Sequence, residues 1–348
     1  MAEIHQLIPK NHYGCRPGQT TTDALHYVVV TAKDAWWSSN EMAILFLDIK
    51  GVFPSVILDH LIHDMRSRGI PEEYTEWIKW KVEARHTTVC FNDFNTAAIE
   101  ILWGLDQGCP LLGISYQFYN TGVIEVVNQQ KGEDCVGFVD DTTIIAEGAN
   151  LQEACNKLTS IMTRPGEVLE WAKDHEYHFA LDKFRLMGLT RKRKPDPTRT
   201  RKTHPKTHPS ITLGQHTIKP TATHKFLGIL IDQELHFKEH INYALAKGSK
   251  YLMQYWWLAK STKGITAKHM WKYYLTVAVP KMLYAADIFL VPATKTKQGH
   301  QRTHQQASQN SKAGGPIHNE SNDNYSKWHT GHPWKPPTIP PPHIQTYT

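Results

Sequence analysis

The sequence predicts an α+β fold in which an antiparallel sheet is backed by helices. The run MAILFLDIKGVF, Met42 to Phe53, is almost continuously apolar and has the length of a buried central strand. A second run, GFVDDTTII from Gly137 to Ile145, is rich in the β-branched residues that strands favour and is typical of a hairpin. Helical periodicity fills the stretches between these runs. With 348 residues, the chain is long enough for one large domain or two.

Two amphipathic helices are predicted on either side of the first strand. In TTTDALHYVVVTAKDAWW, residues 20–37, apolar residues recur at helical spacing, and Thr22 or Asp23 lies near the cap. The first strand follows, and Asp48 lies at its carboxyl end. Ser55 then opens SVILDHLIHDMRSRGIP, whose apolar residues again form one face of a helix.

The middle of the chain is predicted to contain a hairpin and two further helices. The segments HTTVCFND and TAAIEILWG flank Asn92 and Asp93 as the two strands of a hairpin would. The segment PLLGISYQFYNTGVIEVVNQQ, residues 110–130, is typical of a helix entered through GLDQGCP. Later, Asn150 is a predicted helix N-cap, and Glu153 three residues further on forms a capping-box arrangement with it.

The last third of the chain changes character twice. The segments ITLG, HTIKP and KFLGILID are predicted to be short strands. From Phe237 to Leu290 the pattern is helical and aromatic, which is typical of a packed core, with stacking on bases as the alternative. Residues 292–348 are rich in Gln, His, Asn, Ser and Pro and are predicted to be a disordered, low-complexity tail, because they contain too few apolar residues to offset the entropy of ordering.

Positive charge is concentrated in one segment of the chain. The formal net charge is +6, and the run from Arg191 to His208 holds eight Lys and Arg residues against the single Asp196. Such a run favours a polyanion such as nucleic acid. A solvated flexible loop is the alternative interpretation of the same run.

Cysteine usage and hydropathy restrict the class of protein. The five cysteines show no CxxC spacing, which argues against a zinc knuckle and against a disulfide framework and indicates an intracellular protein. No signal peptide is recognisable at the start, and Pro280, Lys281 and Asp287 interrupt the most apolar late stretch. We therefore expect a soluble protein that does not span a membrane.

Asp140 and Asp141 are adjacent carboxylates inside an otherwise apolar, β-branched run. Their mutual repulsion raises the free energy of the fold unless a cation lies between them, so a metal site is one interpretation and a tight turn is the other. Asp48 ends a second strand earlier in the chain. Carboxylates from different strands can hold two divalent cations roughly 4 Å apart, as nucleotidyl transfer requires.

Several motifs occur in the order found in one family of enzymes: YGCRPGQTTTDALHYV, FLDIKGVFPSV, GLDQGCPLLGISYQFYN, FVDD, LDKFRLMGLTRK and FLGILID. Together they resemble the reverse transcriptases of non-LTR (LINE-type) retrotransposons, of the sort abundant in fungal genomes. The likeness covers about residues 5 to 290. The resemblance implies a right-hand polymerase fold with a palm of antiparallel sheet, partial fingers and a helical thumb.

The resemblance also implies roles for individual residues. The metal ligands would be Asp48, Asp140 and Asp141, and Lys183 would lie near the triphosphate as a fourth catalytic residue. Phe53 would be the steric gate that favours deoxynucleotides. The nucleotide-binding set would consist of Phe53, Gln107 and Gly108, with Gly104 and Gly108 permitting close approach of the backbone to the nucleotide. The predicted nucleic-acid-binding residues are Arg16, Leu227, Gly228 (the last two in the primer grip), Arg191, Lys192, Arg193 and Lys194.

From the resemblance we expect three regions and a set of ligands. Residues 1–235 would form partial fingers and the palm, including a basic loop at 191–209, residues 236–291 a thumb-like helical region, and residues 292–348 the tail. The cofactor would be Mg²⁺ or Mn²⁺, whose preferred ligands are oxygens. The partners would be an RNA template, a DNA primer and dNTPs, and the protein would act in the nucleus during retrotransposition.

The chain departs from the family pattern in ways that bear on activity. Asp106 and Cys109 stand where Pro and Ser are commonest, and Asp106 adds a negative charge near a phosphate-binding region. The basic fingers residues of the family would precede Met1, so we expect a chain truncated at both ends. Three hypotheses follow: an RNA-directed DNA polymerase domain, a non-catalytic nucleic-acid-binding remnant of the same family, and an unrelated magnesium-dependent phosphotransferase or nuclease.

Overall fold

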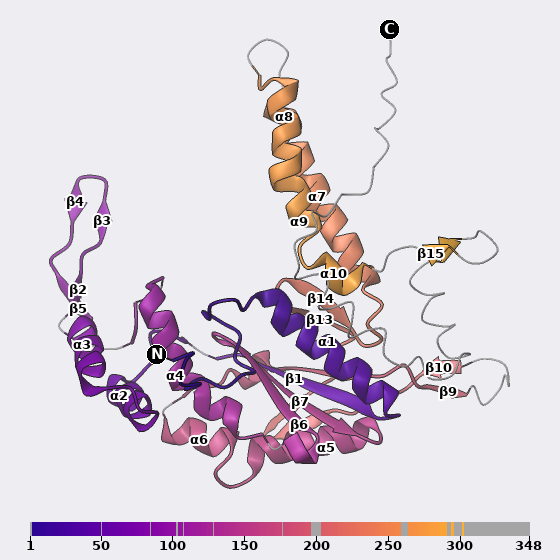
Figure 1. Ribbon diagram of the computed structural model, residues 1–348, viewed down its shortest axis with the longest axis horizontal. Coiled ribbons are helices and arrows are strands. Elements are labelled where there is room, and N and C mark those ends of the chain that lie inside the picture. The colour runs from indigo at the N-terminus through magenta and orange to yellow at the C-terminus, as the bar shows by residue number, and fades with distance from the viewer. Residues whose placement is uncertain are drawn as a thin grey trace. The chain divides into compact units, whose positions relative to one another are not determined.

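The computed structural model describes residues 2–49, 51–83, 85–101, 104–106, 108–127, 129–175, 177–195, 203–258, 264–290, 294–295 and 301–302 (Figure 1). The chain separates into two units, Met1–Leu290 and Val291–Thr348. In the second unit the described residues form β15 (Thr294–Lys295) and β16 (Gln301–Arg302), which pair antiparallel. The rest of the predicted disordered tail lies outside the described residues.

A four-stranded sheet lies at the centre of the first unit, in the order β6-β7-β1-β8. Its strands are β6 (Glu133–Phe138), β7 (Asp141–Gly148), β1 (Glu41–Leu47) and β8 (Arg185–Leu189), and each neighbouring pair is antiparallel. All seven residues of β1 are buried, as the continuous apolar run predicted. The predicted α+β class, with an antiparallel sheet backed by helices, is therefore confirmed.

The register of the sheet brings the predicted carboxylates to one edge. In the β1–β7 pair Leu47 lies opposite Thr142, so the next residues along the two strands are Asp48 and Asp141. In the β6–β7 hairpin Phe138 lies opposite Asp141, which leaves Asp140 in the turn. Segments more than ninety residues apart in sequence thus end side by side.

Helices cover both faces of the sheet because β1 is apolar on both sides. Side chains alternate between the faces of a strand, so Met42, Ile44 and Phe46 pack in one core cluster with α1 (Thr21–Trp37). The intervening Ala43, Leu45 and Leu47 pack in a second cluster, with α5 (Leu151–Thr163) and the loop hairpin β11 (Ile211–Leu213) and β12 (His216–Ile218). Figure 1 shows α1 and α5 on opposite sides of the strands.

A third core cluster lies beside the carboxylate edge of the sheet. It is built from α2 (Leu58–Ser67), α3 (Glu72–Val82) and α4 (Pro110–Glu125), with α6 (Val168–Asp174) contributing Ala172. One narrow hairpin follows α3; its base is formed by β2 (Arg85–Thr87) with β5 (Ile99–Ile101) and its outer part by β3 (Cys90–Phe91) with β4 (Phe94–Asn95). The tip of this hairpin is at Asn92, as the sequence predicted.

Both edges of the central sheet are covered by other backbone. At the β6 edge, His12 bridges Gly137 in parallel, and the Tyr13 N–H donates to the Gly137 carbonyl over 2.7 Å. At the β8 edge, the Thr221 N–H donates to the Leu186 carbonyl over 2.8 Å. Within the described residues, the sheet is therefore continued on both sides by short irregular segments.

The remaining elements follow β8. The basic run forms β9 (Arg193–Pro195) and β10 (Thr203–Pro205), and then comes the hairpin of β13 (Thr223–Phe226) and β14 (Ile229–Asp232). The helical region comprises α7 (Lys238–Leu258), α8 (Ala267–Tyr273), the π-helical turn Tyr274–Ala278, α9 (Val279–Met282) and α10 (Ala286–Phe289). In the described part of the chain, no helix is both long and apolar enough to cross a membrane.

Four details differ from the sequence-based expectations. The N-cap of α1 is Thr20, not Thr22 or Asp23, because the Thr20 side chain accepts from the Asp23 N–H and Asp23 completes the capping box. Helix α2 begins at Leu58 rather than near Ser55, since Ser55 closes a tight turn by donating to the Gly51 carbonyl. The segment KFLGILID is not one strand but the hairpin β13–β14, and α3 was not predicted.

Candidate active site

Asp48 is held by its backbone at the end of the central strand. The Ala180 N–H donates to the Asp48 carbonyl over 2.8 Å, and the next residue, Ile49, bridges Phe179 antiparallel. The Asp48 side chain is partly exposed, but its Oδ2 atom is buried and accepts no hydrogen bond from the described residues. The compensating charge is Lys183, whose Nζ lies 3.2 Å from that oxygen.

Lys183 comes from the short 3-10 helix η2 (Leu181–Lys183), which follows the segment that pairs with Asp48. The Lys183 N–H donates to the Ala180 carbonyl over 2.8 Å. The same residue, Ala180, therefore fixes the backbone of both members of the Asp48–Lys183 ion pair. The predicted triphosphate lysine and the first predicted metal ligand lie together.

Asp140 lies in the β6–β7 turn and Asp141 begins β7, and both residues are exposed to solvent. The residue before them, Val139, has φ 59°, a left-handed conformation that is strained for a β-branched side chain. The turn is held from beneath by Asn120, whose Nδ2 donates to the Val139 carbonyl over 3.2 Å and to the Thr142 Oγ1 over 3.1 Å. The turn interpretation of the aspartate pair is therefore correct, and it does not exclude the metal-site interpretation.

The three carboxylates act on one another electrostatically. Partial burial, the charge of Asp140 and the charge of Asp48 together raise the pKa of Asp141 to about 6. Asp140 also contributes, after burial, to the raised pKa of the Tyr116 hydroxyl beneath it. Carboxylates that repel in this way gain stability from a cation placed among them.

A pocket of about 190 Å³ opens between these groups. Asp48 and Asp141 line it from the strand ends of the sheet, Lys183 lines it from η2, and His224 and Lys225 line it from β13. Burial, and then the charge of Arg185, lower the pKa of His224. The pocket therefore brings the carboxylates of Asp48 and Asp141 together with the side chains of Lys183, His224 and Lys225.

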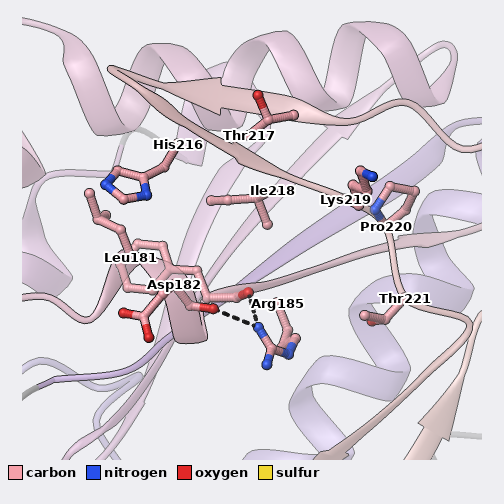
Figure 2. A pocket seen from close by; sticks show the side chains of 10 residues that line it. Leu181, Asp182, Arg185, His216, Thr217, Ile218, Lys219, Pro220 and Thr221 are labelled. Carbon is pink, nitrogen blue, oxygen red and sulfur yellow. Dashed lines mark hydrogen bonds between the residues drawn. The ribbon is translucent and has the colours of Figure 1, made fainter.

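A second pocket of about 340 Å³ lies on the outer flank of η2 (Figure 2). Its lining includes Asp182, Arg185 and Lys219, and the Arg185 Nη1 donates to the carbonyl oxygens of Asp182 and Phe184 over 3.0 and 2.9 Å. Lys183 lies in sequence between residues that line this pocket. The two pockets thus flank the same short helix.

The donor set has the chemistry of a Mg²⁺ site. Three carboxylates supply hard oxygen ligands, and the buried Asp48 Oδ2 without a hydrogen bond is an oxygen that a cation could satisfy. Among the described residues, however, no group of three or more His, Cys, Asp or Glu side chains is gathered closely enough to hold a metal ion as it stands. The carboxylate oxygens are therefore ligands of the type that Mg²⁺ prefers, while in this structure the positive charge that faces Asp48 is the Lys183 ammonium.

The predicted nucleotide-binding residues are only partly placed. The Phe53 ring packs on Tyr116 with centroids 5.3 Å apart, above the turn that carries Asp140. Gln107 lies outside the described residues. Gly104, with φ 77°, makes its close approach to the backbone of Phe53 and Pro54, because a Cβ there would lie 2.5 Å from the Pro54 Cα. Gly108 has φ 96° and open space around it.

Three of the predicted nucleic-acid-binding residues, Arg16, Leu227 and Gly228, lie outside the basic run and have defined structural surroundings. The Arg16 guanidinium donates to both carboxylate oxygens of Glu3 over 2.7 Å and to the carbonyl of His12 over 3.0 Å. Leu227 and Gly228 form the turn of the β13–β14 hairpin, with φ 44° and 88°. The Tyr284 hydroxyl donates to the Leu227 carbonyl over 2.9 Å, which ties this turn to the helical region.

The start of the basic run contacts the protein itself. The Arg191 guanidinium lies 4.6 Å above the Trp36 ring and donates to the Glu234 carbonyl over 3.1 Å. Arg193 pairs with the Glu234 carboxylate at 3.3 Å. The Lys192 Nζ donates to the Ser39 carbonyl over 2.6 Å, and Lys194 is exposed on β9. Nucleic-acid binding by these four residues stays a prediction.

Lys206, later in the same run, neutralises a fully buried carboxylate. Its Nζ lies 2.6 Å from the Glu41 Oε1, and Glu41 also accepts from the Leu151 N–H over 2.8 Å and from the Thr190 hydroxyl over 3.1 Å. These contacts anchor the far end of the basic run to the first residue of β1. At least one of its lysines is therefore a structural residue.

Sequence reasoning did not identify Asn120 and Tyr177. Asn120 is fully buried on α4, and Tyr177 precedes the segment that pairs with Asp48. The signal was present in α4, where Ser115, Gln117, Asn120 and Thr121 are polar residues inside a helix that is buried on nearly all sides. Polar side chains in such a helix need partners, and here the partners include the Asp140 turn.

Comparisons with known proteins agree with these motifs. The profile of the family described as "Reverse transcriptase (RNA-dependent DNA polymerase)" matches residues 1–231. The chain is 22% identical over 289 residues to the probable RNA-directed DNA polymerase from transposon X-element of Drosophila melanogaster, covering 82% of this chain. It is also 22% identical over 295 residues to the RNA-directed DNA polymerase from mobile element jockey of Drosophila funebris, covering 84% of this chain.

The chain spans 30% of the length of each of these two relatives. A solved structure of telomerase from Candida tropicalis, in complex with a TWJ fragment of telomeric RNA, aligns with a TM-score of 0.42 at 10% identity, covering 80% of this chain and 44% of that one. The affinity with fungal elements stays a prediction. Because the family profile covers more than half of the chain, and because the relatives are LINE-type elements, this chain belongs to the reverse transcriptase (RNA-dependent DNA polymerase) family as a domain of the non-LTR retrotransposon type.

Proposed function

We propose that this domain is an RNA-directed DNA polymerase that adds deoxynucleotides to the 3′ end of a DNA primer on an RNA template. The observation that carries the proposal is the convergence of Asp48 and Asp141 on one pocket with Asp140 in the adjoining turn, where burial and then the charges of Asp140 and Asp48 raise the pKa of Asp141 to about 6. Carboxylates this close together repel one another and destabilise the fold unless a cation lies among them. A divalent cation held there could take part in nucleotidyl transfer.

Asp48, Asp140 and Asp141 are the residues that would hold Mg²⁺ or Mn²⁺. Ions bound there would supply an activated 3′-hydroxyl and neutralise the charge that develops on the leaving pyrophosphate. The protein contributes position, because the turn carrying Asp140 and the strand end carrying Asp48 are both fixed by backbone hydrogen bonds.

Lys183 is the proposed partner of the triphosphate. Its ammonium is more than half exposed and can leave Asp48 when that carboxylate is engaged otherwise. It would then face the leaving phosphates, where a positive charge or a donated proton lowers the barrier to phosphoryl transfer. A lysine that alternates between Asp48 and the phosphates would neutralise whichever of the two is uncompensated.

Phe53 is the proposed selector for deoxynucleotides. Its ring rests on Tyr116, and its carbonyl accepts from the Leu105 N–H over 2.7 Å, so both ring and backbone are held in place. A rigid aromatic ring beneath the nucleotide sugar excludes a 2′-hydroxyl by contact. The β13–β14 turn at Leu227 and Gly228 is proposed to contact the primer, and the exposed part of the basic run to contact nucleic-acid backbone.

The test is primer extension by the purified chain with an RNA template, an annealed DNA primer, Mg²⁺ and dNTPs. We expect extension by the wild-type chain and at least a hundredfold loss in Asp140→Asn. Asp182→Asn is the matched control, because Asp182 is exposed on η2 and belongs to the lining of the outer pocket, not to that of the candidate active site. Equal extension by wild-type and Asp140→Asn would refute the proposed polymerase activity.

The same experiment separates the alternative functions. A non-catalytic nucleic-acid-binding remnant would retain RNA with a steep salt dependence, show no extension and bind equally well after Asp140→Asn. A nuclease or other phosphotransferase would cleave nucleic acid in the absence of dNTPs. Reverse transcription of this element type is primed at the chromosomal target, so we propose that the domain acts in the nucleus.

A further inference from the structure

A chain of three buried side chains lies directly beneath the candidate active site. The Tyr116 and Tyr177 hydroxyls are 2.8 Å apart, and the Tyr177 hydroxyl donates to the Asn120 Oδ1 over 2.9 Å. Asn120 and Tyr116 are fully buried, and Tyr177 is 6% exposed. Hydrogen bonds in such surroundings are costly to leave unmade, so this arrangement is well defined.

One end of this chain fixes the aspartate turn. The Asn120 amide uses both of its hydrogens, one on the Val139 carbonyl and one on the Thr142 Oγ1. These two acceptors bracket Asp140 and Asp141 in sequence. Val139 is strained at φ 59°, and such a conformation persists only where the surrounding structure holds it.

The other end fixes the strand end that carries Asp48. Tyr177 lies two residues before Phe179, which bridges Ile49, and three residues before Ala180, whose N–H donates to the Asp48 carbonyl. A shift of Tyr177 would therefore move the backbone to which Asp48 is bonded. Its link to Asn120 joins the two carboxylate-bearing segments through side chains rather than through the sheet.

Tyr116 connects Phe53, the proposed nucleotide-binding residue, to the same set of hydrogen-bonded side chains. Its ring supports Phe53 at 5.3 Å, and its hydroxyl bonds Tyr177. The three side chains together touch the turn of Asp140, the backbone of Asp48 through its partner segment, and the ring of Phe53. Helix α4 supplies two of the three, so its position sets the spacing of all three groups.

We propose that Asn120 and Tyr177 are positioning residues that set the separation between the Asp48 carboxylate and the Asp140 and Asp141 carboxylates, and thereby the affinity of the site for divalent cations. The catalytic part of this inference rests on the proposed polymerase function. The cation affinity does not, because it can be measured on the chain without nucleic acid or dNTPs.

The test compares Tyr177→Phe and Asn120→Leu with the wild-type chain. Tyr177→Phe removes only the hydroxyl, and Asn120→Leu replaces the amide group by an apolar side chain with the same number of heavy atoms. We expect each variant to bind Mn²⁺ roughly five- to tenfold more weakly in an electron paramagnetic resonance titration, since each loses hydrogen bonds of ordinary strength that hold the ligands in place. The half-saturating Mg²⁺ concentration in primer extension should rise by a similar factor, with kcat falling more than KM for dNTP rises.

Tyr119→Phe is the matched control. Tyr119 is as buried as Tyr177, comes from the same helix α4 as Asn120, and its hydroxyl donates to the His175 carbonyl over 2.8 Å, outside the chain of three. We expect Tyr119→Phe to lower the melting temperature about as much as Tyr177→Phe and to leave Mn²⁺ affinity unchanged.

Three outcomes would count against the proposal or separate it from the proposed function. Mn²⁺ affinity unchanged in Tyr177→Phe, with a melting temperature like that of Tyr119→Phe, would reduce the role of these residues to stability. A wild-type chain with no Asp140-dependent Mn²⁺ binding would overturn the positioning role as well. Asp140-dependent binding that weakens in Tyr177→Phe, in a chain that extends no primer, would support the positioning role while refuting the polymerase.

Discussion

Asp140 and Asp141 satisfy two interpretations that the sequence presented as alternatives. They occupy a tight turn, and water and exposure relieve part of their repulsion. The same turn brings them to the strand end of Asp48, where the pKa of Asp141 rises to about 6 through burial and the two neighbouring charges. The turn therefore sets the positions of Asp140 and Asp141, and the pairing of β1 with β7 brings Asp48 close to them.

His12 makes the stability of the fold sensitive to acid. Burial, with a further contribution from Arg16, lowers the pKa of His12 to about 3, and neither ring nitrogen has a hydrogen-bond partner in the described structure. The unfolded chain binds a proton below about pH 6.5 and the folded chain does not. The free energy of unfolding should therefore fall by about 1.4 kcal/mol for each pH unit between about 6.5 and 3 on account of this residue.

The His12→Phe variant should remove that contribution. Urea denaturation at pH 7 and pH 5 should show a pH-dependent loss smaller than that of the wild-type chain by about 2 kcal/mol. His216→Asn, at an exposed position on β12, should keep the wild-type loss. An identical loss in His12→Phe and wild-type would contradict the burial of a neutral imidazole.

Gly104 and Gly108 allow the cost of a left-handed backbone conformation to be compared with the cost of a steric clash. Both have positive φ, but only at Gly104 would a Cβ meet backbone, 2.5 Å from the Pro54 Cα. Gly104→Ala should lower the free energy of unfolding by at least about 2 kcal/mol, and Gly108→Ala by about 1 kcal/mol from backbone conformation alone. Equal losses in chemical denaturation would show that the contact with Pro54 yields easily.

At the scale of elements, the patterns that predicted best were those with a single physical cause. The all-apolar run predicted β1 because a central strand is buried on both faces, and Asn150 predicted the start of α5 because a side-chain acceptor is needed there. The spacing of motifs predicted that Asp48 and the aspartate turn belong to one site. Each of these inferences used information local to one segment, or the order of segments along the chain.

The failures needed information that no single segment contains. KFLGILID has no polar side chain between Lys225 and Asp232, yet Leu227 and Gly228 adopt left-handed conformations, and the Tyr284 hydroxyl from the helical region holds their turn. Helix α3 was missed because Trp77 and Trp80 remain exposed and blur its apolar face. Asn120 was missed because its role depends on a turn that is nineteen residues distant and meets it only in the folded chain.

The N-cap of α5 offers a direct test of local sequence control. The Asn150 Oδ1 accepts from the Glu153 N–H over 3.0 Å. Asn150→Ala should lower the free energy of unfolding by about 1 kcal/mol, because one N–H at the helix start loses its acceptor. Gln152→Ala, one position into the helix and exposed, should change it by less than half as much in the same denaturation experiment.

At the scale of the whole molecule, the basic residues form two groups: those that pair with acidic side chains of the protein, and those that remain exposed to solvent. The chain carries a net charge of +6, but part of the basic run compensates buried or neighbouring acids such as Glu41 and Glu234. Exposed cations near the site are then the ones available to nucleic-acid phosphates. Lys225, on β13 at the wall of the candidate catalytic pocket, is such a residue.

Lys225 should therefore contribute to the salt dependence of RNA binding. In Lys225→Gln, the slope of log K against log salt concentration should become shallower by about 0.7 to 0.9, which corresponds to one phosphate contact. Lys157→Gln is the control, because the Lys157 Nζ bonds the Glu147 carbonyl at the end of β7 remote from Asp141. Equal slopes for Lys225→Gln and wild-type would place the bound strand elsewhere.

The short pairing of His12 and Tyr13 with Gly137 has a practical consequence for anyone expressing this domain. The segment masks the outer hydrogen-bonding groups of β6, and an unmasked strand of this kind recruits strands from other molecules. A version trimmed to begin at Pro17 should consequently self-associate, with light scattering that grows with concentration, even though Asp48, Asp140 and Asp141 are all retained.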